Sequence, residues 1–583
     1  MKSFLKNIFS TIIGMFLSII ILLLLCVGII NIVSSEKEFK VKENTILKID
    51  LTSTSVVERA SENPLDGLNL SGDIGSKIEL KELLDNIEKA KEDKNIKAIY
   101  INTSLVNAGL SQTEEIRNKL LEFKAINKPI IAYSEGYSQL AFYLASVANK
   151  IYLNPQGIIE LKGLSTSQLF FKGLLEKLDI DMQIIRHGKF KSAIEPFSLD
   201  KMSDSNRKQM KKLLNSIGSN IMDSIASQRE ISLSNIRKHA NNLSLDDAKS
   251  CLDLNYVDGL IYQDQIEEKL SAIAGGEKLN LISINKYTKV KSPDKVISRN
   301  KIAIIYANGT IKSGKGDETS IGSESTAKAI RKARTDKNVK AIILRINSGG
   351  GSALASDVIL RETILTKEAK IPLVVSMGDY AASGGYYIAC AADSIVANPN
   401  TITGSIGVFG MIPNLKNFYK NKLGITIDTV KTHRSADMGI NRALTPFERK
   451  KIQKSVENIY NTFIKHVAEG RNMSLEDVDK IGQGRVWTGN DAKDIGLIDT
   501  YGGIDQAIEI ASLLAKIDDY RIISLPKKKD PFTELILKLE GETSIYKLAK
   551  QKIGFNSKKL DHIENLISTD IIQARIPFFI ELE

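Results

Sequence analysis

The chain has 583 residues, too many for one compact core, so two to four domains are expected. A composition of 43% hydrophobic and 26% charged residues, with 12 Pro, excludes a fibre or a disordered tail. The net charge of +11 is spread over basic residues scattered among acidic ones, and no nucleic-acid-binding motif accompanies it. We therefore expect no nucleic-acid partner.

The first predicted element is a membrane-spanning helix. Ile8 to Val33 is a nearly continuous apolar stretch of 26 residues without a charge, long enough to cross a bilayer core of about 30 Å. Lys2 and Lys6 precede it, which places the N-terminus in the cytoplasm. Val33-Ser34-Ser35 is a poor signal-peptidase site. Residues 1–37 are therefore predicted to form a cytoplasmic N-terminus and an uncleaved anchor.

The rest of the chain contains an internal repeat. Motifs recur in one order at offsets of 243 or 244 residues: Asn95–Tyr100 with Asn338–Ile343, Asn154-Pro155 with Asn398-Pro399, and Asp247–Lys249 with Asp491–Lys493. Such self-similarity predicts two copies of one domain of about 240 residues. We assign residues 38–290 to the first repeat and 298–583 to the second. The polar stretch from Lys286 to Arg299 is the predicted linker.

Each repeat has the pattern of an α/β domain. Short apolar runs between amphipathic segments predict buried strands at Ile46–Leu51, Ile96–Ile101 and Pro129–Tyr133, and at Lys301–Tyr306, Val339–Ile346 and Pro372–Ser376. Thr445-Pro446-Phe447-Glu448 predicts a helix start with a capping box. Alternating strands and helices indicate a largely parallel sheet covered by helices.

One serine stands at a predicted strand-to-helix junction. Val374–Met377 is a predicted strand, Gly378–Tyr380 a predicted turn, and Ser383 begins a predicted helix. A serine at a helix N-terminus lies beside unpaired N–H groups that stabilise an oxyanion. The alternative is a simple N-cap. The G-x-S-x-G elbow is absent, because Ala381 replaces its first glycine.

A second candidate element is the glycine-rich loop Asn347–Ser352, which follows a buried strand. Gly349, Gly350 and Gly351 permit unusual backbone dihedrals, and one use is to aim an N–H group at a carbonyl oxygen. A phosphate-binding loop is the rival interpretation, but its following Lys is missing. A plain strand-to-helix turn is the third.

A nucleophilic serine needs a base, and none of the five His lies in a recognisable triad motif. Lys191 is the other kind of candidate, although a surface lysine is the ordinary interpretation of such a residue. Cys26, Cys251 and Cys390 form no CxxC or Cys/His cluster, so neither a zinc site nor a disulfide framework is predicted.

Taken together, the repeat, the anchor and three motifs resemble the signal peptide peptidase SppA family of the long, double-domain type. The motifs are Lys191–Phe197, Gly378-Asp379-x3-Ser383-Gly384-Gly385-Tyr386 and Val486-Trp487-Thr488-Gly489-x2-Ala492. The resemblance implies a tandem duplication of a domain similar to Clp protease and crotonase, with Ser/Lys protease activity. It makes Ser383 the nucleophile and Lys191 the general base, with an oxyanion hole from Gly384 and Gly350 or Gly351. Ser192 is a weaker candidate for orienting the Lys191 amine.

The two repeats divide this dyad. Gln139 stands 244 residues before Ser383, and Arg434 and Ser435 stand 243 and 244 residues after Lys191. An arginine cannot serve as the base because it stays protonated. A lysine with an ordinary pKa near 10.4 becomes neutral near pH 7 only if burial lowers that pKa by about 3 units. Lys191 is therefore expected to be enclosed, with activity rising towards mildly alkaline pH.

The chain departs from the family pattern at one position of the glycine loop. The family usually has Ser-Pro-Gly-Gly-Ser, whereas this chain has Ser348-Gly349-Gly350-Gly351-Ser352. The replacement of Pro by Gly349 loosens the loop and leaves the choice of oxyanion donor open.

The resemblance also implies substrates, partners and a location. It implies hydrophobic signal peptides as substrates, a homotetramer, no metal, nucleotide or organic cofactor, and a site on the periplasmic side of the bacterial inner membrane. Other membrane or envelope proteins are alternative substrates, and a crotonase-like acyl-CoA enzyme and an inactive scaffold are alternative functions. Beyond residue 525 we predict a helix over Pro531–Ile553 and a packed terminus at Arg575–Phe579, with docking to a neighbour or the membrane as its alternative.

Overall fold

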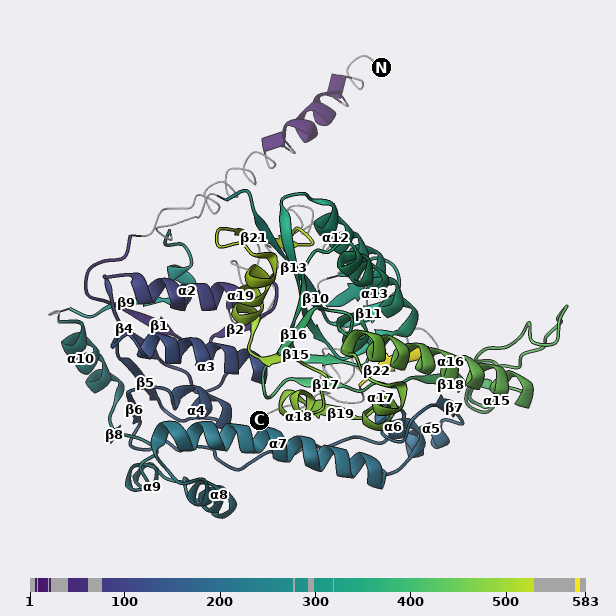
Figure 1. Cartoon of the computed structure of the whole chain (residues 1–583), viewed down its shortest axis with the longest axis horizontal. Coiled ribbons are helices and arrows are strands. Elements are labelled where there is room, and N and C mark those ends of the chain that lie inside the picture. Colours follow the sequence, from purple (N-terminus) through teal and green to yellow (C-terminus); the bar gives the residue numbers. More distant parts are fainter. Residues whose placement is uncertain are drawn as a thin grey trace.

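The computed structural model describes residues 6–7, 9–18, 20–21, 40–60, 76–275, 278–291, 298–317, 319–528 and 572–576. Two α/β units lie side by side within them, one built from the N-terminal half of the chain and one from the C-terminal half (Figure 1). The alternation of apolar strand runs and amphipathic helices predicted from the sequence is present in both.

The first unit is built on a six-stranded sheet in the order β8-β6-β5-β4-β1-β9, whose neighbours are all parallel. Its strands are β1 (Thr45–Ile49), β4 (Ile96–Ile101), β5 (Ile130–Ser134), β6 (Lys150–Leu153), β8 (Gly259–Leu260) and β9 (Asn280–Ser283). Its helices are α2 (Leu80–Glu92), α3 (Leu110–Lys124), α4 (Gln139–Ala145), α7 (Asp204–Arg229), α8 (Leu233–Asn242), α9 (Ala248–Asp253), α10 (Gln263–Ala274) and α11 (Ile284–Tyr287). β2 (Thr54–Val57) and β3 (Ser76–Glu79) form a separate two-stranded sheet.

The second unit repeats this plan in an eight-stranded sheet whose main path is β19-β17-β15-β13-β10-β21. The strands are β10 (Lys301–Asn308), β13 (Val339–Ser348), β15 (Leu373–Ala382), β16 (Ser394–Ala397), β17 (Ile402–Gly404), β19 (Val486–Thr488), β20 (Thr500–Tyr501) and β21 (Arg521–Leu525). The helices are α12 (Ser323–Thr335), α13 (Ala353–Glu368), α14 (Gly384–Ala389), α16 (Pro446–Arg471), α17 (Leu475–Ile481), α18 (Gly489–Asp494) and α19 (Ile504–Ala515).

Equivalent helices of the two units match closely. α7 and α16 are both 26 residues long and start 242 residues apart. Each begins at a hydroxyl cap, Ser203 or Thr445, and each ends at a residue in the left-handed conformation. The predicted capping box is present at α16, where Thr445 N donates to Glu448 at 2.9 Å and Glu448 N donates to Thr445 Oγ1.

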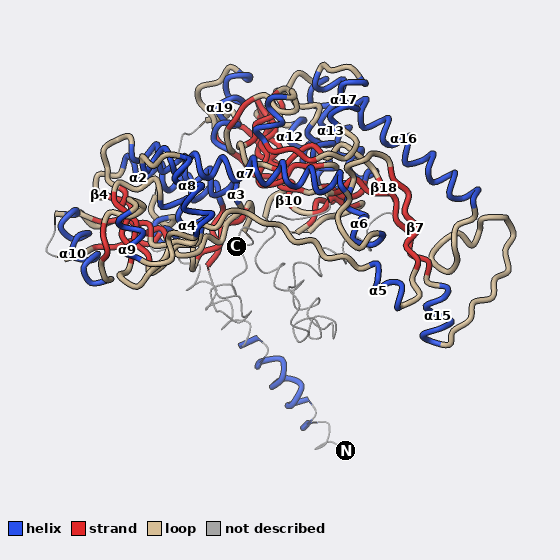
Figure 2. Tube along the Cα trace, turned by 90° about the horizontal axis from the view of Figure 1, so that it is seen from below, coloured by secondary structure: helices blue, strands red, loops and turns tan. Residues whose placement is uncertain are grey.

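A third sheet joins the two units. Its order is β12-β11-β14-β22-β18-β7, and its strands are β7 (Asp181–Arg186), β11 (Thr310–Lys312), β12 (Ser320–Gly322), β14 (Gly350–Ser352), β18 (Phe409–Asn414) and β22 (Ile572–Arg575). β7 belongs to the first repeat and pairs antiparallel with β18 of the second, over six residue pairs. Figure 2 shows these two strands running together away from the second unit, past the short helix α6 (Glu195–Ser198) and towards α5 (Lys172–Lys177).

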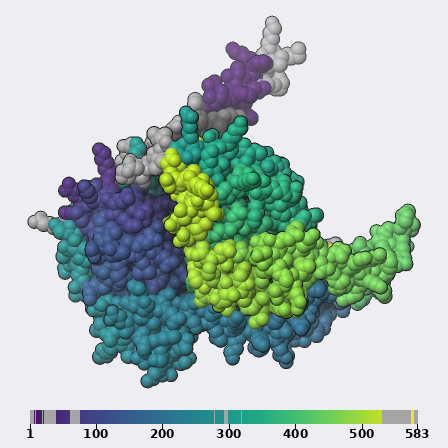
Figure 3. Space-filling model, viewed as in Figure 1, coloured from purple at the N-terminus to yellow at the C-terminus, as the bar shows by residue number. Residues whose placement is uncertain are grey.

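Part of the second repeat projects from the body of the molecule. It comprises α15 (Lys416–Leu423) and the loop 424–442, which we call the arm. Figure 3 shows the arm as the green projection at the right edge. Its apolar side chains are exposed rather than packed: Leu423, Ile425, Ile427, Val430, Met438 and Ile440.

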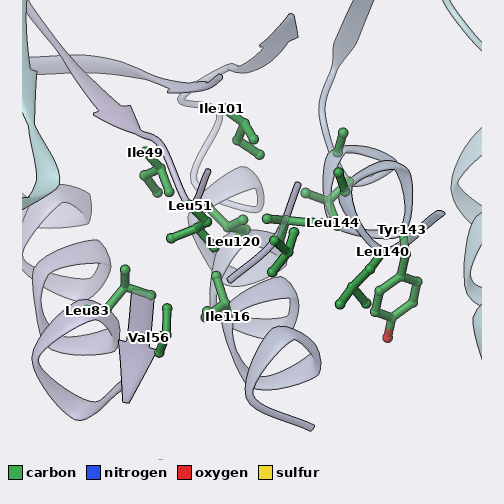
Figure 4. Packing of buried hydrophobic residues seen from close by; sticks show 14 of the residues in the cluster. Ile49, Leu51, Val56, Leu83, Ile101, Ile116, Leu120, Leu140, Tyr143 and Leu144 are labelled. Carbon is green, nitrogen blue, oxygen red and sulfur yellow. The ribbon is translucent and has the colours of Figure 1, made fainter. Parts of the chain in front are cut away.

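The core is shared between the repeats. One continuous cluster of buried apolar side chains contains strand and helix residues of the first unit together with residues of the second, among them Ile343. Figure 4 shows its first-repeat part, in which Ile116 and Leu120 of α3 belong to the same cluster as Ile49 and Leu51. Because burial of apolar surface is the main favourable term in folding, this shared cluster fixes the two repeats to each other.

The predicted strands are present with shifts of a residue or two at most ends, but the predicted turn at Gly378–Tyr380 was wrong. These residues lie inside β15, at an irregularity where Ile346 pairs with Met377 and Ser348 with Ala381. β15 therefore accommodates two more residues than β13 over this interval. The bulge lengthens the strand and carries Ser383 past the end of β13.

Some predictions fall partly or wholly outside the described residues, among them the terminus Arg575–Phe579, of which residues 577–579 lie outside. Of the predicted anchor Ile8–Val33, residues 8, 19 and 22–33 lie outside them, and the described residues around 9–18 are helical. Among the described residues, no helix combines the length and the apolarity needed to cross a membrane. The helix predicted over Pro531–Ile553 lies entirely outside the described residues.

Candidate active site

Ser383 stands between β15 and α14 in an unusual backbone conformation. Its φ of 57° and ψ of −115° lie outside the regions that non-glycine residues normally occupy. The surrounding backbone holds it there: Ser383 N donates to Gly404 O at 2.8 Å, and Tyr387 N donates to Ser383 O at 2.8 Å. The side chain makes no capping hydrogen bond to α14. Ser383 is therefore not a side-chain N-cap, and its hydroxyl is left for another partner.

Lys191 reaches the second repeat from the first. β7 pairs with β18, and the chain after β7 returns along the second repeat, where Phe190 N donates to Gln483 O at 3.0 Å. Gly484 allows the close approach, because a Cβ at that position would stand 2.6 Å from Lys191 Cβ. Lys191 then leads into the short 3-10 helix Ser192–Ile194 and α6.

The structure brings Lys191 and Ser383 into direct contact. The Lys191 Nζ and Ser383 Oγ atoms are 2.6 Å apart, although the two residues are 192 positions apart in the chain. Both side chains are completely buried. Burial lowers the pKa of Lys191 well below its ordinary value, because a charged ammonium loses its hydration there. The predicted enclosure of this lysine is thus present in the structure.

Ser405 is a site residue that the sequence reasoning missed. Lys191 Nζ donates to Ser405 Oγ at 3.1 Å and to Ser405 O at 3.2 Å, and Ser405 itself has a φ of 50°. Ser192, the residue predicted to orient the amine, instead accepts a hydrogen bond from Gln209 Nε2 at 3.1 Å. The side chain of Ser192 therefore faces Gln209 on α7 and not the Lys191 amine. Ser405 takes the place predicted for Ser192.

The repeat comparison contained a signal for Ser405. At the offset of 244 residues that relates Gln139 to Ser383, the first-repeat counterpart of Ser405 is Leu161. The first repeat thus lacks both hydroxyls. Its Gln139 has a purely structural contact, since Gln139 Oε1 accepts hydrogen bonds from Lys162 N and Gly163 N.

The candidate oxyanion glycines occupy two different positions. Gly350, with a φ of 97°, lies against Gly384: a Cβ at Gly350 would stand 2.7 Å from Gly384 N. Gly351 lies against β11, where a Cβ would stand 2.0 Å from Ile311 O. Gly350 N donates to Ser348 Oγ at 3.1 Å. The glycine loop and the N-terminus of α14 therefore converge beside Ser383.

A buried cluster of charges joins the repeats behind this site. Arg345 on β13 donates to Glu58 at 2.8 and 2.9 Å and to Glu115 on α3 at 2.8 Å. Asp379, in the β15 bulge, accepts a 2.8 Å bond from Ser111 N at the start of α3. Burial raises the pKa of Glu115 to about 7 and that of Asp379 to about 6. We call Arg345, Glu58, Glu115 and Asp379 the inter-repeat cluster.

The cysteines and the other potential metal ligands lie apart from one another. Cys251 and Cys390 are buried as free thiols. Across the described ranges, His, Cys, Asp and Glu side chains do not gather into a group that could hold a metal ion.

Comparison with known proteins identifies the family. The model of peptidase family S49 matches residues 122–275 and 366–518, once in each repeat. Protease 4 of Salmonella typhi is 37% identical over 519 residues, which cover 86% of this chain and 84% of that protein. The chain belongs to peptidase family S49.

Further comparisons match a plant relative over most of the chain and a solved structure over part of it. This S49 peptidase is 34% identical to the chloroplastic serine protease SPPA of Arabidopsis thaliana, over 87% of this chain and 75% of that protein. Among solved structures, a ClpP1 mutant from Listeria monocytogenes matches 35% of this chain and 94% of its own, with 19% identity and a TM-score of 0.24. The family match assigns the chain to the serine proteases and not to the acyl-CoA enzymes.

Proposed function

We propose that this S49 peptidase cleaves peptide bonds with Ser383 as the nucleophile and Lys191 as the general base. The observation that carries the proposal is the 2.6 Å contact between Lys191 Nζ and Ser383 Oγ in a fully buried site. Burial favours the neutral amine, which is the form that accepts a proton. The unusual backbone conformation of Ser383 is typical of strained residues at functional sites.

The proposed reaction has two halves. Lys191 takes the proton of the Ser383 hydroxyl while Oγ attacks the substrate carbonyl carbon, and the same amine then delivers the proton to the leaving peptide nitrogen. Water subsequently hydrolyses the ester. The resemblance assigns the oxyanion hole to N–H groups of Gly384 and of Gly350 or Gly351, and the close packing of Gly350 against Gly384 N supports that assignment. Ser405 would hold the amine in line.

As substrates we propose hydrophobic peptides of the signal-peptide type, released into or near a membrane. The apolar stretch Ile8–Val33 supports this, because an anchored enzyme would meet such peptides at the bilayer surface. We accordingly propose a single-pass protein of the bacterial inner membrane with its catalytic part on the periplasmic side. Segments of other membrane or envelope proteins are the competing substrates.

We also propose that the chain assembles into a homo-oligomer, and the resemblance implies a tetramer. The unpaired arm supports the proposal of assembly. α15 follows α5 by 244 residues, so loop residues 425–430 are the counterpart of β7. β7 pairs with β18, whereas 425–430 pair with no strand of the described chain. The first-repeat counterpart of β18, residues 165–170, is likewise unpaired in the described chain. Residues 425–430 in the arm of one molecule would therefore pair with residues 165–170 in the first repeat of another.

The decisive experiment compares wild type, Ser383→Ala and Lys191→Ala on a fluorogenic peptide taken from the apolar part of a signal peptide. Each change is expected to lower kcat/KM by at least about a thousandfold, and the double variant to be no worse than either single one, because the two groups act as a unit. Lys189→Ala, an exposed lysine two residues away, is the matched control and should retain activity.

Other outcomes would reject parts of the proposal. Full activity in either single variant would show that the dyad is wrong. A folded, assembled wild type without activity would reject the protease assignment for this chain. A higher kcat/KM for segments of intact envelope proteins than for signal peptides would move the substrate assignment to that class.

A further inference from the structure

The sheet that joins the repeats contains a strand from the far end of the chain. β22 lies between β14 and β18 and is antiparallel to both, with Ala574 opposite Gly351 and Gln573 opposite Phe409. Without β22, the edges of β14 and β18 would face each other across a gap one strand wide. Such a pair of edges offers hydrogen bonds to an extended peptide on both of its sides. We call this space the strand slot.

The strand slot lies directly beside the dyad. β14 is part of the glycine loop, and β18 begins four residues after Ser405. A Cβ on Gly350 would stand 2.1 Å from the carbonyl oxygen of Ala574, and a Cβ on Gly384 would stand 3.1 Å from the same oxygen. The Ala574 carbonyl therefore lies against the two glycines that flank the proposed oxyanion hole. This is where the carbonyl of a bound substrate belongs.

The fit of the segment is close. Gln573, Ala574, Arg575 and Ile576 are each at most 3% exposed. Ile576 N donates to Gly349 O at 2.9 Å, and a Cβ on Gly349 would stand 2.8 Å from Ile576 Cγ1. Gly349 stands where the SppA family usually has a proline. In this chain, the missing side chain at 349 is what makes room for Ile576.

We propose that residues 572–576 occupy the substrate position in cis, so that the C-terminal segment competes with peptide substrates for the active site. The inference rests on the proposed protease function of Ser383 and Lys191. It adds a binding site for an extended peptide strand with a small residue at the position of Ala574, whose side chain is completely buried. It also assigns an occupant, the chain's own C-terminal segment.

The size of the effect follows from tethering. A segment that belongs to the same chain as its binding site is present there at an effective concentration of the order of millimolar. If the segment fills the slot nine-tenths of the time, the apparent KM for a competing substrate rises about tenfold while kcat is unchanged. Competition of this kind has a kinetic signature that damage to the dyad does not share.

The test uses two variants of the full-length protein and one truncation. Ala574→Pro removes the backbone N–H opposite Gly351 and should expel the strand, whereas Ala574→Gly keeps that N–H and is the matched control. Truncation after Asp570 removes the strand altogether. Ala574→Pro and the truncated chain are both expected to show a KM about tenfold lower than wild type with equal kcat. Ala574→Gly should behave as wild type.

A binding measurement separates this inference from the catalytic proposal. A fluorescent peptide of residues 570–578 should bind the truncated chain carrying Ser383→Ala, as measured by anisotropy, and the same peptide with Ala574→Pro should not. Unlabelled peptide should restore the higher KM of the active truncated enzyme. These binding results are independent of whether Ser383 is the nucleophile, whereas the dyad variants test only catalysis.

Two results would overturn the inference. One is a KM that stays at the wild-type value in both Ala574→Pro and the truncated chain. The other is failure of the peptide to bind a truncated chain that is folded by circular dichroism and cooperative thermal unfolding. Should the truncated chain not fold, Ala574→Pro against Ala574→Gly decides the kinetic question alone.

Discussion

Lys191 carries a stability cost that its proposed role requires. Its lowered pKa means that the folded protein binds fewer protons at this site than the unfolded chain, whose lysines have a pKa near 10.4. The free energy of unfolding attributable to this site therefore falls as pH falls from about 10.4 to the folded pKa. A methionine of similar length has no such cost.

Lys191→Met should thus be inactive yet more stable than wild type, by a margin that grows as pH is lowered from about 9 to about 6. Urea unfolding midpoints at several pH values measure the margin. Lys189→Met, at an exposed position two residues earlier, is the control and should show no growing margin. A margin for Lys191→Met that is the same at all pH values would contradict a neutral buried amine.

Ser405 tests how the amine is oriented. Its Oγ accepts from Lys191 Nζ at 3.1 Å, so Ser405→Ala should lower kcat by about 10- to 100-fold with little change in KM. Ser405→Gly separates the hydroxyl from the backbone, because glycine readily adopts the φ of 50° seen here. Both variants should lose kcat alike. Ser192→Ala, which loses only a contact to Gln209, should lose far less; equal losses would return Ser192 to the site.

At the scale of single residues, the sequence predicted Lys191 and Ser383 as the dyad only through the family motifs and the repeat. Local patterns could not show that the two side chains meet, because the contact spans 192 positions. Ser405 was within reach of the same comparison, through Leu161 at the equivalent position, but a single serine in a Thr-Gly-Ser sequence has many ordinary uses.

Among the elements, α3 links the two repeats. It belongs to the first repeat, and its Glu115 accepts a hydrogen bond from Arg345 on β13 of the second. Arg345 is 1% exposed, so this contact is buried. Removal of one member of a buried ion cluster leaves the others uncompensated and costs about 3–5 kcal/mol. Glu115 can relieve that cost by binding a proton, because burial raises its pKa to about 7.

Arg345→Met should therefore lower the free energy of unfolding by about 3–5 kcal/mol at pH 8 and by less at pH 5. Arg331→Met is the control, because the Arg331 side chain is 60% exposed and its partner Glu362 still pairs with Arg334, so the change should cost no more than about 1 kcal/mol. Chemical denaturation at the two pH values measures both. An Arg345→Met defect that is equal at pH 5 and pH 8 would show that the carboxylates stay charged.

The central elements could be predicted because their sequences are strongly apolar and long enough to show a period. The strands of the third sheet could not be predicted in this way. β11, β12 and β14 have three residues each, and β7 pairs with a strand more than two hundred residues away. The β15 bulge was mistaken for a turn because Gly378-Asp379 has turn composition, while the bulge is held by contacts from Asp379 to α3 that no local pattern reveals.

For the whole molecule, assembly through the arm gives a further test. Val430 is fully exposed and Ile427 is 42% exposed, so Ile427→Asp with Val430→Asp should leave the fold intact and place two charges in the proposed contact. Light scattering after size exclusion should show a smaller particle than wild type. Leu513→Asp, an exposed leucine on α19, is the control. An unchanged mass for the arm variant would remove the arm from the interface.

The division of the proposed dyad between the repeats has a consequence for the number of active sites in each chain. β7 of one repeat completes the site of the other, as a neighbour would in an assembly of single-domain subunits. In terms of the proposed dyad, the first repeat has Gln139 where the second has Ser383, and the second has Arg434 and Ser435 at the offsets that match Lys191 of the first. The two repeats therefore supply one proposed acylation site between them, whereas two repeats that each had both residues would supply two.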